Sequence, residues 1–264
     1  MTNSQKLKEM NVDQQFIELH PLLKSYLYRL TANKQDMEDI LQETYIRVNE
    51  KISSFRGEST FKTWVFAIAT NLARDNKRVQ NRWADDVQDR CRAAADASVD
   101  VQNRMLNAFA DLPEKKFEFA EHINYCFTCL SKNLSLEKQI AVILKEVFDF
   151  TRMEIASILH VSEGSVKHTL HNGRKELQEK FDNRCALINK NGPCYQCSQL
   201  NDYFQGDQTA QEKVSNLKLK TQNDSEENFI ERMNLVKLVD PVHGNGAHIE
   251  DTILQILRET IQDQ

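Results

Sequence analysis

The chain has 264 residues, 40% of them hydrophobic and 28% charged, and its formal net charge is −5. These values fit one large domain or two to three small ones, and they exclude fibrous and collagen-like proteins. The acidic balance disfavours a protein that binds DNA unaided, because such proteins are typically basic, and favours help from a partner. No apolar run reaches the roughly 18 residues of a membrane span. The N-terminus lacks the apolar core of a secretory signal, so we expect a cytoplasmic protein without membrane contact.

The pattern along the chain is helical. Only 7 Gly and 4 Pro interrupt it, and apolar residues recur at the spacing of one helix face, so we expect an all-α fold. The first helix covers residues 12–31. Pro21 lies inside this run and either opens the main helix near His20 or kinks it.

Two further helices follow closely. One begins near Lys34–Asp36 and turns an apolar stripe inward, with Tyr45 among its members. The next begins at Ser59 or Thr60, both suitable N-caps, and runs to about Val79.

The segment 36–82 holds two different surfaces. Its acidic stretch, DMEDILQETYIRV, has an apolar stripe and suits a protein partner. The apolar helix that follows ends in a basic group beside aromatic residues, which suits nucleic acid: Arg74, Lys77, Arg78 and Arg82. A solvated charged face is the alternative for the acidic stretch. Core packing is the alternative for Phe61, Trp64 and Phe66.

Residues 135–184 have the pattern of a helix-turn-helix. Ser135 is the expected N-cap of a first amphipathic helix, and a short helix follows in which the small Ala156 permits close packing. Ser162 caps a third helix from about Glu163, after a tight turn. This helix buries one apolar face and presents a polar one, as a helix in the major groove does. A plain helical hairpin is the alternative.

The remaining segments carry weaker signals. Residues 80–120 are rich in Ala, Asp, Asn and Gln, which predicts a flexible linker with one transient helix. The polar block 205–227 is predicted to be disordered. Two amphipathic pieces, NFIERMNLVKLV and HIEDTILQILRETI, follow on either side of the turn DPVHGNG.

Four cysteines form two CxxC pairs, at Cys126/Cys129 and Cys194/Cys197. Two such pairs have the spacing of a four-thiolate zinc site, with Cys185 or His122 as substitute ligands. A thiol switch and unconnected cysteines are the alternatives that the sequence leaves open.

The two blocks together resemble the bacterial sigma-70 family of RNA polymerase initiation factors, specifically its extracytoplasmic-function (ECF) group. DMEDILQETYIRV resembles the polymerase-binding helix and FRGESTFKTWVFAIATNLARDNKR resembles the segment that engages the −10 element. LSLEKQIAVILKEVFDFTRMEIASILHVSEGSVKHTLHNGRKEL resembles the domain that reads the −35 element. The resemblance implies two small helical domains, sigma region 2 at 10–82 and sigma region 4 at 120–190. They are joined by the linker 83–119 and followed by a C-terminal extension, 191–264.

The resemblance also implies site residues. The polymerase-binding positions are Asp36, Glu38, Asp39, Gln42 and Glu43. The positions implied for the −10 element and promoter opening are Phe55, Arg56, Ser59, Thr60, Phe61, Trp64, Asn71, Arg74, Lys77 and Arg78. Those implied for the −35 element are Ser165, Lys167, His168, His171 and Arg174. His160 stands where the family often has Gly, although His tolerates positive φ better than most residues.

By this resemblance the chain binds core RNA polymerase, at the clamp coiled coil of β′ and the β flap, and directs initiation at promoter DNA. A separate anti-sigma protein is a further implied partner. A stand-alone helix-turn-helix regulator is the alternative, but it leaves 36–82 unexplained. No catalytic array or phosphate-binding loop is found, so we expect no enzyme activity and no required cofactor, with zinc as one interpretation of the cysteines. The extension either regulates the factor in cis or adds to the core of the second domain.

Overall fold

The structure is a computed structural model that describes residues 12–110, 119–184, 225–244 and 247–262. Within these ranges all regular structure is helical and no strand occurs, which confirms the all-α prediction. The chain divides into two compact units. Unit 1 comprises Met1–Arg82 and Ser135–Gly173, and unit 2 comprises Trp83–Leu134 and Arg174–Gln264. The domain boundaries drawn from the sequence remain a prediction.

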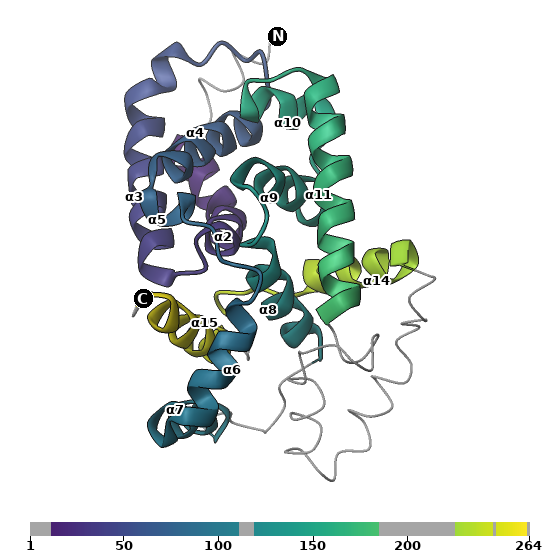
Figure 1. Cartoon of the computed structure of the whole chain (residues 1–264). Helices are drawn as coiled ribbons and strands as arrows, with labels where there is room; N and C mark the ends of the chain where they lie inside the picture. Colours follow the sequence, from purple (N-terminus) through teal and green to yellow (C-terminus); the bar gives the residue numbers. More distant parts are fainter. Residues whose placement is uncertain (1–11, 111–118, 185–224, 245–246, 263–264) are drawn as a thin grey trace. The chain divides into compact units, whose positions relative to one another are not determined.

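The first half of unit 1 is built from α2 (Val12–Thr31), α3 (Lys34–Lys51), the short η1 (Ile52–Ser54), α4 (Phe61–Asp75) and α5 (Lys77–Gln80). Helix α2 continues through Pro21. Helix α3 begins where the sequence predicts, because the side chain of Asn33 accepts a hydrogen bond from the backbone N–H of Asp36. Helices α2, α3 and α4 pack on one another around buried apolar side chains (Figure 1).

Helix α4 ends earlier than its apolar pattern predicts. Thr60 caps its start, but it stops at Asp75 rather than near Val79. Asn76 has an extended backbone, and its side chain accepts hydrogen bonds from the backbone N–H groups of Arg78 and Val79. An asparagine in this position starts a new helix rather than continuing the old one. The four-residue α5 therefore carries Lys77 and Arg78 separately from α4.

The second half of unit 1 is the predicted helix-turn-helix. It comprises α9 (Leu136–Val142), the π-turn η2 (Ile143–Val147), α10 (Arg152–Leu159) and α11 (Glu163–Arg184), whose residues beyond Gly173 belong to unit 2. Thr151 and Glu154 form a capping box at the start of α10. His160 ends α10 in the left-handed region, at φ 55° and ψ 45°. Ser162 then accepts a hydrogen bond from the backbone of Ser165 and starts α11, as predicted.

One aromatic core joins the two halves of unit 1. The ring of Phe66 on α4 lies 4.9 Å from that of Phe150 and 5.9 Å from that of Phe148. The amide of Gln139 on α9 is fully buried, where it donates to the carbonyl of Arg29 at 3.0 Å and accepts from Arg82 at 2.8 Å. The helix-turn-helix is thus packed onto the helices that precede the linker.

Unit 2 contains α6 (Val87–Ala97), α7 (Val99–Ala110), α8 (Phe119–Ser131), the end of α11, α14 (Ser225–Leu238) and α15 (Ala247–Gln262). Residues 87–110 are thus two helices, and the prediction of a flexible linker with one transient helix was wrong here. The reason is tertiary: α15 packs on both α6 and α7 and covers them with apolar surface from a distant part of the chain.

Both amphipathic pieces of the extension are helices, as their pattern predicts. Helix α14 packs on α8, and α15 packs on α6, α7 and α8. The chain turns between them at Asp240, whose side chain accepts from the backbone N–H groups of Val242 and His243. Most of the block predicted to be disordered, residues 205–224, lies outside the described residues. Within the described ranges, no helix is both long and apolar enough to cross a membrane.

Candidate functional site

The acidic positions of α3 form an outward surface. Asp39 and Gln42 are exposed, and Glu38 and Glu43 are partly exposed. Glu43 pairs with Arg47 at 2.8 Å, one helical turn further on, which fixes its direction along the helix. This surface offers carboxylates and an amide to a partner that carries complementary charge.

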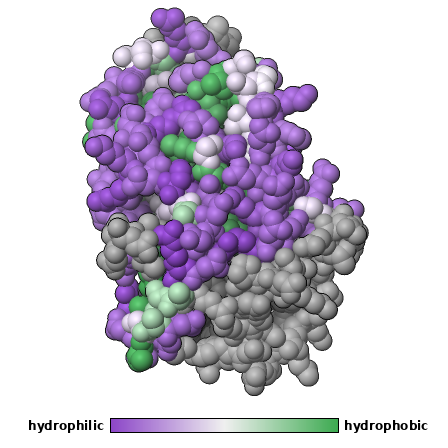
Figure 2. Space-filling view, in the orientation of Figure 1, coloured by the Kyte–Doolittle hydropathy of each residue, from purple (hydrophilic) through white to green (hydrophobic). Residues whose placement is uncertain are grey.

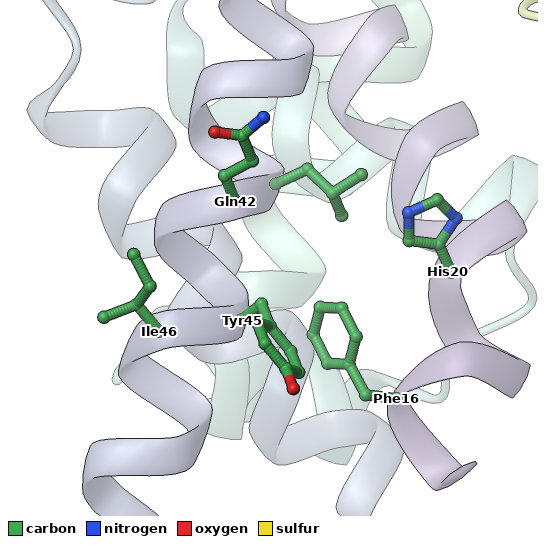
Figure 3. A pocket seen from close by; sticks show the side chains of 6 residues that line it. Phe16, His20, Gln42, Tyr45 and Ile46 are labelled. Carbon is green, nitrogen blue, oxygen red and sulfur yellow. The ribbon is translucent and has the colours of Figure 1, made fainter. Parts of the chain in front are cut away.

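An apolar hollow of about 390 Å³ lies beside these side chains, between α2 and α3. Its lining is shown in Figure 3: Phe16, His20, Leu41, Gln42, Tyr45 and Ile46. The rings of Phe16 and Tyr45 lie 5.1 Å apart, and Ile46 is 48% exposed at the edge. Contiguous exposed apolar side chains rimmed by polar ones are typical of a protein-binding surface.

Tyr45 differs from its predicted place in the core. It is 40% exposed, and its hydroxyl donates a hydrogen bond to Asp13 at 2.8 Å. That hydrogen bond, together with the charge of Asp13, raises the pKa of Tyr45. The raised pKa favours the neutral form of the phenol. The ring of Tyr45 forms one wall of the hollow.

Asp36 lies apart from the other acidic positions. Its side chain is only 5% exposed and accepts a hydrogen bond from Arg78 at 2.7 Å. The structure thus places Asp36 inside the domain, as an anchor for Arg78, and not on the outward acidic surface where the sequence puts it. The cause is the N-terminal position of Asp36 on α3, which turns its carboxylate towards α5.

The start of α4 carries an aromatic cluster. The ring of Phe55 lies 4.9 Å from Trp64 and 6.1 Å from Phe61. Phe61 is buried, whereas Phe55 and Trp64 are partly exposed. Around them Arg56 is exposed and Ser59 partly exposed. Phe66, by contrast, is fully buried in the aromatic core, so core packing is its role.

The far end of α4 and α5 form the basic end of this region. Lys77 is exposed, and the side chain of Arg78 is 71% exposed despite its pairing with Asp36. Arg74 forms an ion pair with Glu137 of α9 at 3.2 Å. Burial lowers the pKa of Arg82 to about 10, and its guanidinium is held by Gln139 and the carbonyl of Val79. Lys77 and Arg78 are therefore the most accessible cations here.

Helix α11 separates its apolar and polar residues as predicted. Val166, Leu170 and Leu177 are buried. The exposed positions on the opposite face are Ser165, Lys167, His168 and His171, with Arg174 partly exposed. Because Lys167, His171 and Arg174 are spaced by four and three residues, they share one side of the helix.

The inner side of α11 packs unusually closely. A Cβ on Gly173 would lie 2.9 Å from Cγ2 of Val142 on α9, so the absence of a side chain permits this contact.

Figure 2 gives the molecular surface in the orientation of Figure 1, and the described residues in that view are largely hydrophilic with small apolar patches.

The cysteine prediction is only partly covered by the structure. Cys126 and Cys129 are buried one turn apart on α8, and His122 lies one turn before them. Burial lowers the pKa of His122 to about 4, so its imidazole is neutral, the form that can bind a metal. Cys185, Cys194 and Cys197 lie outside the described residues. Among the residues described, no three metal-binding side chains gather into a site.

The apolar hollow between α2 and α3 is the candidate binding feature that sequence reasoning missed. It requires Phe16 and His20 of one helix to face Tyr45 and Ile46 of another, a pairing that follows from packing. A signal was present, since Tyr45 and Ile46 are adjacent and only one of two neighbouring helical positions can lie at the centre of an inward stripe.

Residues 16–83 match the family description "Sigma-70 region 2" and residues 126–177 match "Sigma-70, region 4". The chain is 32% identical over 156 residues to the ECF RNA polymerase sigma factor SigW of Bacillus subtilis. The aligned region covers 58% of this chain and 80% of SigW. The chain is 29% identical over 164 residues to SigX of the same organism, covering 62% of this chain and 79% of SigX.

A solved structure, the sigma factor RpoE in complex with the anti-sigma factor NepR from Bartonella quintana, matches with a TM-score of 0.46 at 20% identity. The match covers 64% of this chain and 96% of that one. From the sequence matches, the chain belongs to the ECF group of the sigma-70 family. It is a sigma factor that directs promoter-specific transcription, as the sequence predicts.

Proposed function

We propose that the chain binds core RNA polymerase through the outward acidic surface of α3 and the apolar hollow beside it. The observation that carries this proposal is the hollow: it places Tyr45 and Ile46 next to Gln42, so a partner can bury apolar area and meet polar groups together. A basic helical element such as the clamp coiled coil of β′ fits this combination. The β flap and an anti-sigma protein remain predicted partners. The factor acts in the bacterial cytoplasm and catalyses no reaction itself.

Promoter contacts are assigned to the two basic surfaces. Lys167, His168 and His171 on the exposed face of α11 meet the −35 element, and Arg174 reaches a phosphate beside it. Arg56 and Trp64 at the start of α4 meet the −10 element, with Lys77 and Arg78 on the flanking backbone. A partly exposed aromatic side chain can stack on an unpaired base, which stabilises an opened strand.

The test of the polymerase surface is Ile46→Glu. The substitution places a charge at the edge of the hollow, and we expect the Kd for core polymerase to rise about tenfold or more, because central apolar contacts dominate interface energies. Binding is measured by fluorescence anisotropy with labelled sigma factor. Leu238→Glu is the control, since Leu238 is 79% exposed on α14. Equal affinities of Ile46→Glu and wild type would remove the hollow from the interface.

We propose in addition that the two CxxC pairs, Cys126/Cys129 and Cys194/Cys197, bind one structural zinc ion. Two described thiols one turn apart on α8 support this proposal, because that spacing lets both sulfurs of a pair reach one ion.

Metal analysis tests the zinc proposal. The full chain purified without chelator should hold about one zinc per molecule, and Cys126→Ser should lose it. Thiol titration after treatment with peroxide separates the alternatives. A metal-free protein that loses two thiols reversibly would indicate a thiol switch, and a metal-free protein with inert thiols would indicate unconnected cysteines.

A further inference from the structure

Helix α15 holds the segment that joins the two promoter-binding halves. Its buried aliphatic face is formed by Ile249, Ile253, Leu254, Ile256 and Leu257. This face packs against α6, α7 and α8. Helices α6 and α7 lie between the two matched family regions, so the extension packs on the chain's own connector (Figure 1).

Polar contacts tie α15 to the connector and to the helix that follows it. Arg104 on α7 donates two hydrogen bonds to Glu259, at 2.8 and 3.3 Å. Asn124 on α8 donates to Glu250 at 2.9 Å in a buried position. Bidentate arginine–carboxylate pairs fix geometry as well as adding attraction. Helix α15 therefore fastens α7 and α8 together.

The docking of the extension is partly polar, which suits a contact that can open. Arg232 on α14 is 1% exposed, stacks 4.6 Å from the ring centre of Phe181 and pairs with Asp182 at 3.6 Å. Buried ion pairs add little net stability, because desolvation offsets the attraction. Interfaces between parts of a chain that move apart are typically more polar than permanent cores.

Binding to both promoter elements at once requires the helix-turn-helix to separate from the helices α2–α5 of unit 1. Elements at −35 and −10 lie about 25 base pairs apart, which is roughly 85 Å of B-form DNA. In unit 1, however, α10 packs on α4: Thr63 donates to Glu154 at 3.4 Å, and the Lys62 ammonium lies 4.5 Å from the ring centre of Phe150. One helix-turn-helix cannot occupy this position and the distant upstream element together.

Unfolding of the connector would supply the missing reach. Helices α6 and α7 have 11 and 12 residues, and these span about 35 Å as helices but about 75 Å when extended. We propose that α15 is an intramolecular clasp that keeps α6–α7 folded and thereby holds the factor in a form that cannot engage both promoter elements. This inference rests on the proposed function.

The test compares transcription by four full-length proteins and one truncation, each with core polymerase on a promoter that has both elements. Glu259→Arg breaks the pair with Arg104 and should raise transcript yield about two- to fivefold, the effect of losing one partly exposed ion pair. The swap Arg104→Glu/Glu259→Arg restores opposite charges and should return the yield to the wild-type level. Glu226→Arg, an exposed charge reversal on α14, should change nothing.

Removal of residues 247–264 should raise the yield further, and hydrogen exchange of α6–α7 should accelerate in parallel. If transcription by wild type equals that by Glu259→Arg and by the truncation while all bind core polymerase, the clasp is overturned and the proposed function stands. A swap variant as active as Glu259→Arg also overturns it. If none of the proteins binds core polymerase, the proposed function fails, and the inference fails with it.

Discussion

Individual residues set the local geometry of both proposed promoter-binding surfaces. His160 lies at φ 55° between α10 and α11, where a residue with a Cβ is strained. Asp36 fixes Arg78 through a nearly buried ion pair. Each of these residues orients a neighbouring helix end, and so determines where the basic side chains point.

The strain at His160 predicts a stabilising substitution. His160→Gly should raise the free energy of unfolding by up to about 1 kcal/mol, because glycine adopts the left-handed region without a Cβ clash. Since His160 is exposed, little packing is lost. Urea denaturation checks the change in midpoint. His160→Val, which places a β-branched side chain in the same conformation, should be less stable than wild type, and a lower midpoint for His160→Gly would contradict the strain argument.

Structural features of a residue that depend only on its neighbours in the sequence could be predicted. The cap at Ser162 follows from a few adjacent residues and is confirmed. The Asp36–Arg78 pair was not predictable, because it joins residues 42 apart and depends on how α5 packs beside α3. For the same reason Tyr45 was assigned to the core although it lines a surface hollow.

At the scale of elements, the close contact between α9 and α11 fixes the position of α11 in unit 1. Gly173→Ala should destabilise the protein by about 1–3 kcal/mol, because the new Cβ meets Val142, whose side chain is buried and cannot move away. Thermal denaturation measures the effect, and binding to an upstream promoter fragment should weaken with it.

Gly164→Ala is the matched control on the same helix. Its Cβ would lie 3.7 Å from the nearest atom, Oγ of Ser162, which is an ordinary contact. This variant should keep or gain stability, since alanine favours a helix over glycine by roughly 0.5–1 kcal/mol. Equal losses in both variants would mean that glycine at 173 is not required for packing.

Element types were more predictable than their ends or their partners. The apolar spacing located α2, α3, α4 and the helix-turn-helix, since amphipathic periodicity is a local property. The same spacing predicted an end of α4 that lies too far along the chain, because the side chain of Asn76 starts a new helix there. It missed α6 and α7 as stable helices, because their apolar partners lie on α15, about 150 residues further along the chain.

At the scale of the whole molecule, one chain carries the proposed polymerase-binding surface and the two proposed promoter-binding surfaces. The family assignment followed from the order of two motifs in the sequence. The hollow between α2 and α3 and the packing of α15 on the connector required the structure, because each depends on side chains from helices that meet only in the fold.

Transcription from a genomic promoter pool with core polymerase, followed by mapping of the start sites, tests the central claim most directly. We expect transcripts whose promoters share two motifs at a fixed separation, and we expect these transcripts to be lost with Ile46→Glu. Lys167→Ala should relax only the upstream motif, and Arg56→Ala only the downstream one. Transcripts that require neither the chain nor its α3 surface, or motifs that both variants alter alike, would contradict the assignment of the three surfaces.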